Sequence, residues 1–155
     1  MSLRDNLTQD AVQALRVLEP VTLGPRGTVA DAVALMQEHA AGCVFVTEED
    51  RPVGIVTERD VLTKVLAWNL SPDTPIAEVM TSPPEVIQEG CPVIEVIRRM
   101  DRGGFRHMPV VNESDKLQGV VSVKRVVEYL VEYFPSAVFN VPPESVQRRP
   151  TREGA

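Results

Sequence analysis

The chain has 155 residues, of which 43% are hydrophobic, so it can bury one core of ordinary size or two half-domains that share a seam. Its 16 basic and 22 acidic side chains give a formal net charge of −6, which argues against binding to a nucleic-acid backbone. No apolar run approaches the ~20 residues that cross a bilayer, and the first residues lack the apolar stretch of a signal peptide, so we expect a cytoplasmic protein with no membrane span.

The two cysteines, Cys43 and Cys91, lie far apart in the sequence and form no C-x-x-C pair, so neither a disulfide framework nor a zinc site is indicated. We expect both to be buried small apolar residues, with no bound metal ion. No H-E-x-x-H, G-x-S-x-G or P-loop spacing accompanies the two histidines. The sequence therefore offers no catalytic residues and predicts a protein that is not an enzyme.

The first predicted element is a leading helix. Residues 8–18 place Val12, Leu15 and Leu18 on one side, which is the spacing of an amphipathic helix. From the pattern of the whole chain, we expect a leading segment over residues 1–19, a first repeat over 20–70, a linker with a short helix over 71–84, a second repeat over 85–134 and a tail over 135–155.

An internal repeat decides the rest of the fold, because a missed repeat misassigns the whole architecture. In both copies, a helical segment with Val, an acidic residue and Met precedes an apolar stretch, and then Gly, two apolar residues and a hydroxyl follow. The offset between equivalent residues grows by one across the polar turn at 48–52 and its counterpart at 112–116, where hairpins tolerate length changes. The matching pairs are Thr28–Met36 with Pro92–Met100, Cys43–Val46 with His107–Val110, and Gly54–Thr57 with Gly119–Ser122.

Each copy indicates the order β-α-β-β-α, starting from a short strand near Thr22–Leu23 or Val86–Ile87. Apolar residues at helical spacing support the first helix of each copy. The strand residues Val44–Val46 and Val53–Val56 are too uniformly apolar for a sheet with one wet face, so both faces should be covered. We therefore predict an α/β (α+β) fold in which the two repeats pack sheet to sheet with pseudo-twofold symmetry.

The segment between the copies is rich in turn-forming residues. Thr74 and Pro75 have the order of a helix N-cap and first helical position, which predicts a short helix running to Met80. Beyond Phe134 the composition changes to Pro among Ser, Glu, Arg and Gly, which cannot bury enough apolar surface to fold alone. We expect a disordered tail that becomes ordered only if it docks on something.

The duplicated pattern resembles tandem cystathionine-β-synthase (CBS) domains, also known as a Bateman module, over residues 15–134. The strongest match is Gly54–Asp60, which has the family's order of Gly, two apolar residues, Thr or Ser, two variable residues and Asp. Residues Ala32–Met36 and Ile76–Thr81 reinforce it. The resemblance implies a regulatory module that binds AMP, ADP or ATP in clefts between the copies. It also implies a homodimer shaped like a disc, and an action in trans on an unknown partner protein.

Two alternatives stay open. The module could instead sense S-adenosylmethionine or NAD, which the family binds less often. It could also be a structural dimerisation module whose clefts stay empty. This alternative explains, without further assumptions, why the second copy has Arg125 where the motif has Asp.

The residue types in the first motif suit a nucleotide. The strand ends near Val56 and a helix follows, so backbone N–H groups and a helix N-terminus face a phosphate. Thr57 adds a hydroxyl, Arg59 a cation, and Asp60 a carboxylate that can accept hydrogen bonds from ribose hydroxyls. The alternative is that Thr57 caps the helix and Asp60 lies in its first turn without binding a ligand.

The resemblance implies that the other copy completes the cleft around Asp60. Arg106 and His107 would contact phosphate, and Met108 with Val86 would enclose adenine, although His107 could equally be a polar residue at the sheet edge. The predicted site residues are Ile55, Thr57, Arg59, Asp60, Thr81, Ser82, Val86, Arg106, His107, Met108 and Pro109.

The second copy departs from the family pattern, because Arg125 stands where the family has the ribose-binding Asp. A guanidinium only donates hydrogen bonds, so we expect a weaker or empty second site. The polar residues there could hold phosphates or pair with acids such as Glu128. The residues of this second site are Cys43, Val44, Val120, Ser122, Lys124 and Arg125.

Overall fold

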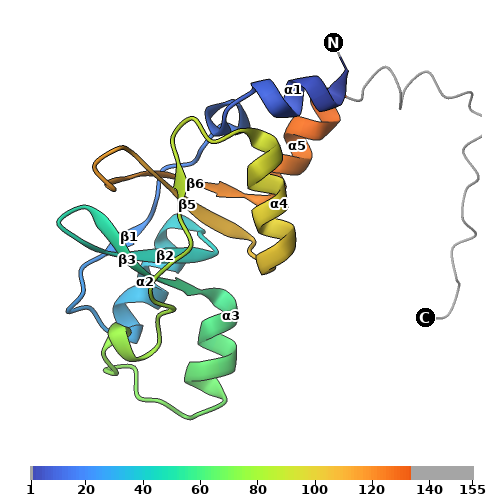
Figure 1. Cartoon of the computed structure of the whole chain (residues 1–155). Coiled ribbons are helices and arrows are strands. Elements are labelled where there is room, and N and C mark those ends of the chain that lie inside the picture. The colour runs from blue at the N-terminus through green and yellow to red at the C-terminus, as the bar shows by residue number, and fades with distance from the viewer. Residues whose placement is uncertain (1, 134–155) are drawn as a thin grey trace, which may run out of the picture.

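The computed structural model describes residues 2–133, which form two similar halves, each with a three-stranded sheet (Figure 1). The predicted order β-α-β-β-α is confirmed in both halves. The first half consists of β1 (Thr22–Leu23), α2 (Val29–His39), β2 (Cys43–Glu48), β3 (Arg51–Thr57), α3 (Glu58–Asp60) and the π-helix η2 (Val61–Leu66). The second half consists of β4 (Ile87–Gln88), α4 (Val93–Gly103), β5 (His107–Val111), β6 (Leu117–Ser122) and α5 (Val123–Tyr133).

The two sheets have the same topology. In each, the short first strand runs parallel to the middle strand, and the middle strand pairs antiparallel with the third. Val46 lies opposite Gly54, and Val110 lies opposite Gly119, so the registers of the two hairpins are equivalent. The additional residue of the second copy therefore lies in the turn, as predicted.

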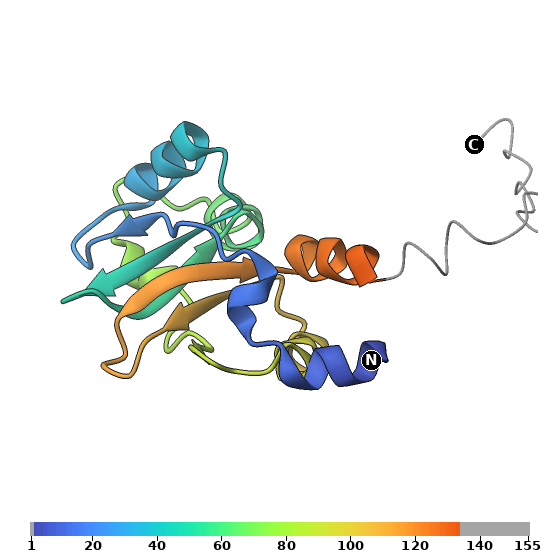
Figure 2. The ribbon, with the colours of Figure 1, turned by 90° about the horizontal axis from the view of Figure 1, so that it is seen from above.

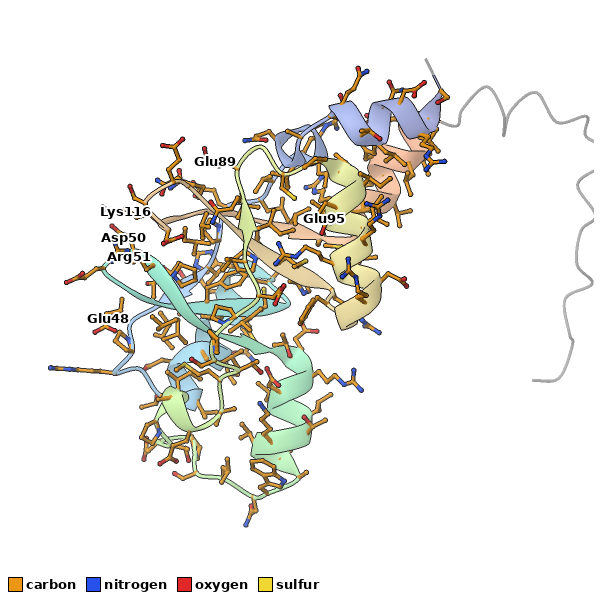
Figure 3. All side chains as sticks on the ribbon, in the orientation of Figure 1. Glu48, Asp50, Arg51, Glu89, Glu95 and Lys116 are labelled. Atoms are coloured by element: carbon orange, nitrogen blue, oxygen red, sulfur yellow. The ribbon has the colours of Figure 1, made fainter. Side chains whose placement is uncertain are left out.

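The hairpin tips of the two halves touch. The N–H of Leu117 donates to the carbonyl of Asp50 at 2.8 Å, and Nε of Arg51 donates to the carbonyl of Ser114 at 3.2 Å. Figure 3 shows Asp50, Arg51 and Lys116 together at these tips. The contact holds the hairpin of one half against the hairpin of the other.

The sheets face each other and the helices lie outside, which confirms the predicted α+β fold with sheet-to-sheet packing (Figure 2). Between the sheets, Cys43, Phe45 and Val120 form a buried cluster, with Ile55 and Leu117 packed on it. Each sheet also packs its outer face on its own helices. Burial of both faces explains why the strands read as continuous apolar runs.

The leading segment is not the single helix expected over residues 8–18. It forms α1 (Leu3–Gln9) and the 3₁₀ helix η1 (Val12–Leu15), separated by an extended step. The step exists because the backbone here pairs with the second half: Val12 N–H donates to Cys91 O at 2.8 Å, and Val93 N–H donates to Asp10 O at 2.9 Å. Val12 and Leu15 are buried in the core of the second half.

The linker mirrors this arrangement on the first half. The short helix predicted to run to Met80 is the 3₁₀ helix η3 (Ile76–Glu78), and Pro75 precedes it as the cap. Ile76 N–H donates to Gly27 O at 2.9 Å, and Val29 N–H donates to Thr74 O at 3.0 Å. Ile76 is buried in the core of the first half.

Each of these segments then pairs with a sheet before it crosses to the other half. Leu18 and Val120 exchange two backbone hydrogen bonds of 2.9 Å, after which the chain enters β1. Thr81 and Ile55 exchange bonds of 2.9 and 3.1 Å, after which the chain enters β4. We refer to residues 17–21 and 80–86 as the crossing segments. They interlock the two halves.

The motif glycines allow the crossing segments to pass. A Cβ on Gly54 would overlap the side chain of Met80, and a Cβ on Gly119 would overlap Val17 and lie 2.9 Å from the carbonyl oxygen of Leu18. Glycine in each motif thus avoids overlap with a crossing segment, with the Met80 side chain at Gly54 and with both side chain and backbone at Gly119.

The predicted tail, residues 135–155, lies outside the described residues. Within residues 2–133, none of the helices combines the length and the apolar character that crossing a membrane requires.

We expect Gly119→Ala to destabilise the protein more than Gly54→Ala. Overpacking costs roughly 1–3 kcal/mol, and the methionine at Gly54 can move aside whereas the Leu18 carbonyl at Gly119 cannot. Urea denaturation would measure both. Gly24→Ala is the control, because nothing lies within 4 Å of a Cβ there. Equal stabilities for all three variants would contradict this role of the glycines.

Candidate functional site

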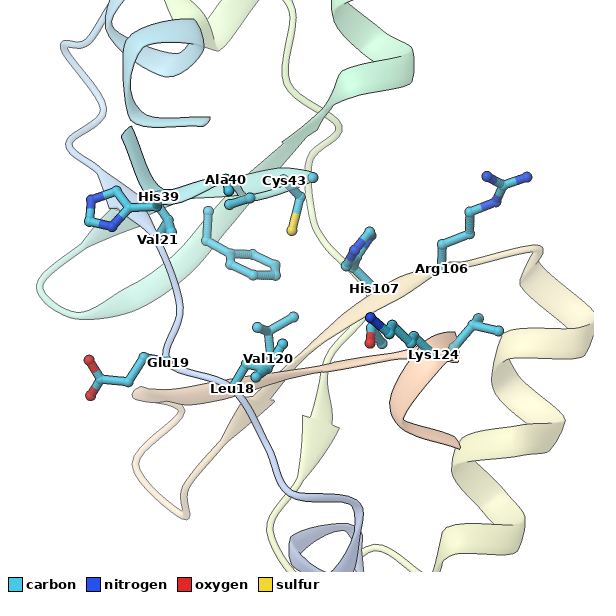
Figure 4. A pocket seen from close by; sticks show the side chains of 15 residues that line it. Leu18, Glu19, Val21, His39, Ala40, Cys43, Arg106, His107, Val120 and Lys124 are labelled. Carbon is cyan, nitrogen blue, oxygen red and sulfur yellow. The ribbon is translucent and has the colours of Figure 1, made fainter. Parts of the chain in front are cut away.

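A cavity of about 620 Å³ opens at the seam between the halves (Figure 4). We call it the seam cavity. Its walls come from the first crossing segment, and from the start of β2 with the preceding turn. The second half contributes the start of β5, the end of β6 and the start of α5. Its lining residues are Leu18, Glu19, Val21, His39, Ala40, Ala41, Gly42, Cys43, Phe45, Arg106, His107, Val120, Ser122, Val123 and Lys124.

The seam cavity has an apolar middle and a polar end. Val120 lies at its middle in Figure 4, Phe45 also lines it, and both belong to the buried cluster between the two sheets. In Figure 4, His107 and Lys124 lie at one end, and the guanidinium of Arg106 points away from them. Glu19 and His39 lie at the other end (Figure 4). An elongated ligand with an anionic group and an apolar body fits this division.

Ser122 ends β6, and Arg125 lies in the first turn of α5. Ser122 Oγ accepts a hydrogen bond from the N–H of Arg125 at 3.4 Å, which leaves the hydroxyl proton available as a donor. Arg125 Nη1 pairs with Glu128 Oε2 at 3.0 Å, and Arg125 is not part of the cavity wall. Of the two possibilities for Arg125, the structure has the pairing with Glu128.

His107 connects the two halves. It lies at the start of β5 opposite Ser122 in β6, and a Cβ on Gly42 of the first half would be 3.3 Å from its Cε1. Burial lowers the pKa of His107, and Arg106 acts in the same direction, while the charge of Glu58 opposes them. The imidazole is therefore biased toward its neutral form.

Cys43 also lines the seam cavity. Burial, assisted by the charge of Glu58, raises the pKa of its thiol to about 12, so the sulfur stays protonated at neutral pH. Among the described residues, no group of three or more His, Cys, Asp or Glu side chains could hold a metal ion.

Asp60 lies in a separate polar cluster. Its Oδ2 accepts from the N–H of Thr57 at 2.9 Å, and its own N–H donates to Thr57 Oγ1 at 3.2 Å, which is a reciprocal helix cap. Its Oδ1 lies 3.3 Å from Nζ of Lys64, and this ammonium also donates to the carbonyl of Val79 at 2.8 Å. The capping role considered from the sequence is thus present, with both carboxylate oxygens engaged.

The second crossing segment runs beside the first motif, as expected. Thr81 pairs with Ile55, and Ser82 Oγ donates to the carbonyl of Val53 at 2.7 Å. Val86 is half-buried and Arg59 is exposed. Thr81 and Ser82 therefore lie beside β3, the strand that leads into the Thr57–Asp60 turn.

Met108 does not fit the expected contact with adenine. Its side chain is fully buried among core residues of the second half, because alternate residues of the middle strand face the helices. Pro109 is buried as well, and Val44 is buried in the equivalent core of the first half. These three side chains are buried inside the protein, and none of them lines the seam cavity.

The structure assigns the predicted binding residues to the two sites differently from the sequence analysis. Arg106 and His107, expected to face Asp60, line the seam cavity with Cys43, Val120, Ser122 and Lys124. Sequence reasoning missed Phe45 and the first crossing segment. The signal that could have found the latter is the repeat itself, because residues 17–21 are the counterpart of the segment predicted around Thr81.

Comparisons with known proteins agree with this architecture. A family model described as CBS domain matches residues 12–67 and 76–132, one match for each half. An uncharacterised protein of Methanopyrus kandleri is 35% identical over 116 residues, which cover 72% of this chain and 59% of that protein. The chain thus spans less than two thirds of that relative's length.

Solved structures resemble this chain as well. A CBS domain protein from Pyrobaculum aerophilum, complexed with AMP, is 27% identical with a TM-score of 0.73, over 81% of this chain and 99% of that one. A hexameric CBS-CP12 protein from bloom-forming cyanobacteria is 32% identical with a TM-score of 0.67, over 76% of this chain and 69% of that one.

We expect Asp60→Ala to lower stability more than Asp31→Ala in the absence of any ligand. Asp31 forms the same reciprocal cap with Thr28 on α2, but it is exposed and has no ion pair with a described residue. Loss of a cap costs about 1 kcal/mol, and Asp60→Ala also leaves Lys64 without its carboxylate. Chemical denaturation would compare the two variants. A larger loss in Asp31→Ala would contradict this ranking.

Proposed function

Because this chain belongs to the CBS domain family, we propose that it is a regulatory module that binds an adenosine-containing ligand between its two repeats. The bound ligand changes how the module acts on a partner protein, and the module itself catalyses no reaction. AMP is the first candidate, since the relative from Pyrobaculum aerophilum is complexed with it. ADP, ATP, S-adenosylmethionine and NAD are the other candidates.

The observation that carries this proposal is the polar end of the seam cavity. Lys124 supplies a cation, Ser122 a hydroxyl, and the start of α5 the positive end of a helix dipole, which together suit a phosphate. The volume of about 620 Å³ is within the usual range for small-molecule sites. Phe45 and Val21 offer apolar surface for the adenine ring.

We place the principal site in the seam cavity and a secondary one at Thr57–Asp60. The sequence alone favoured Asp60, but its carboxylate is already bonded to Thr57 and Lys64. A ligand there would have to share or replace these contacts. In the seam cavity, the open volume lies directly beside Ser122 and Lys124.

A thermal-shift screen with AMP, ADP, ATP, S-adenosylmethionine and NAD tests the proposal. A ligand at a hundred times its dissociation constant adds about 2.7 kcal/mol of stability. We expect such a shift in the unmodified protein and in Asp60→Asn, and its loss in Lys124→Ala, whose exposed side chain can be removed without damage to the core.

Two results would contradict the proposal. Loss of the shift in Asp60→Asn, with Lys124→Ala unaffected, would move the principal site to Asp60. Absence of a shift with every ligand, in protein freed of bound nucleotide, would favour the structural module with empty clefts.

We also propose that a second copy of the chain covers an apolar face formed by the last helices of the two halves. Leu62 and Leu66 are 61% and 65% exposed on η2, and Val127 and Val131 are 51% and 58% exposed on α5. Trp68, 62% exposed, follows η2. Because the two stripes are equivalent under the repeat, the face itself has twofold character, which suits an isologous dimer.

We expect Leu62→Arg and Val127→Arg to convert a dimer into a monomer, since each buries a charge in the proposed interface. Size-exclusion chromatography with light scattering would measure the mass in solution. Gln37→Arg, at an exposed position of α2, is the matched control and should remain dimeric. A monomeric unmodified protein would contradict this interface.

A further inference from the structure

The chain contains 2 histidines, and both line the seam cavity. They differ in surroundings. His39 is exposed at the end of α2, whereas His107 is half-buried at the end of the cavity where Figure 4 also shows Lys124. Imidazole is the side chain whose ordinary titration falls near neutral pH.

We propose that anion binding in the seam cavity is coupled to the uptake of a proton by His107, so that ligand affinity rises as the pH falls. The inference rests on the proposed function, because it requires an anionic ligand in this cavity. It adds a second input, the proton, to what the module senses.

The first step is that the free protein disfavours the imidazolium. The ring of His107 packs against Gly42 and lines the same wall as Cys43, so much of it is removed from water. Arg106, which precedes β5, and Lys124, which lies at the same end of the cavity as His107, are both cations. Burial and Arg106 lower the pKa of His107, and Glu58 of α3 only partly offsets them.

The second step is that a bound phosphate reverses this balance. His107 lies directly opposite Ser122, so a phosphate held by Ser122 and Lys124 lies beside the imidazole. An opposite charge within about 4–6 Å raises a histidine pKa by roughly 1–3 units. The imidazolium can then donate hydrogen bonds from both ring nitrogens, whereas neutral imidazole donates from one. The proton comes from solvent.

The sign follows from these two states. The pKa of His107 is lower in the free protein than in the complex, so binding takes up a proton at pH values between the two. Affinity increases as the pH falls through the pKa of the complex and levels off below that of the free protein. Each unit of difference changes the affinity by about tenfold.

The other groups around the cavity do not account for such a linkage. The Cys43 thiol stays protonated across neutral pH, because burial raises its pKa to about 12. His39 is the one other histidine and is directly testable. The phosphate monoester itself titrates at about pH 6, and cations that favour its dianion make it release protons on binding, which is opposite in sign to uptake by His107.

Calorimetric titration of the full chain with AMP tests the proposal at pH 6.5 and 8.0, and at pH 7.0 in two buffers with different ionisation enthalpies. We expect roughly tenfold tighter binding at the lower pH and a net proton uptake on binding. His39→Gln, which removes the other histidine of the cavity, should keep the net proton uptake even where its affinity differs. His107→Gln should lose the net proton uptake and the gain in affinity at the lower pH.

Proton NMR provides a second readout that does not depend on the folding of His107→Gln. The ring Cε1 protons give two resonances, assigned with His39→Gln, and their titration with and without AMP reports both pKa values. We expect AMP to raise the pKa of His107 and to leave that of His39 nearly unchanged.

The outcomes separate the two proposals. If AMP binds and the His107 titration does not move, the proton linkage is overturned and the proposed function stands. If His39 carries the linkage, the inference is also wrong. If neither AMP nor ATP binds at any pH between 6.5 and 8.0, both proposals fall.

Discussion

The backbone pairing of each crossing segment with the half that it does not enter holds this structure together. Leu18 pairs with Val120 and Thr81 pairs with Ile55 before the chain changes sheets. The halves cannot separate without loss of these bonds and of the apolar contact between the sheets. The seam cavity lies where the first crossing segment passes α5, so its shape depends on the same pairing.

The backbones of the two halves are nearly equivalent, and the difference between their clefts lies in a few side chains. In both halves the first residue of the last helix donates its N–H to the residue before the middle strand, from Glu58 to Gly42 and from Val123 to Arg106, each at 3.0 Å. In the residues that follow, the first half has the Asp60–Lys64 ion pair and a π-helix, whereas the second half has the Arg125–Glu128 pair and an α-helix. Duplication thus supplied two similar frameworks, and substitution gave each a different polar lining.

The sequence was sufficient for the repeat, the order of elements, the topology and the position of the inserted residue, because these depend on local periodicity and on comparison of the copies. It failed for the leading helix, because Asp10 bonds to Val93, a contact that local spacing does not contain. It failed for Met108, because a uniformly apolar strand does not reveal which face of the sheet a residue occupies. The motif located Ser122 and Lys124, but the cavity also needs Leu18 and Phe45, which carry no motif.

The exchange of crossing segments also bears on how such a chain could have arisen. A single repeat with its own preceding segment would leave that segment unpaired and its sheet uncovered. Two separate copies could each pair their preceding segment with the sheet of the other copy. Such domain swapping forms a dimer at a low cost in free energy. The present chain has the geometry of such a swapped dimer fused into one polypeptide. Fusion frees each copy to change on its own, which a symmetric pair of identical chains cannot do.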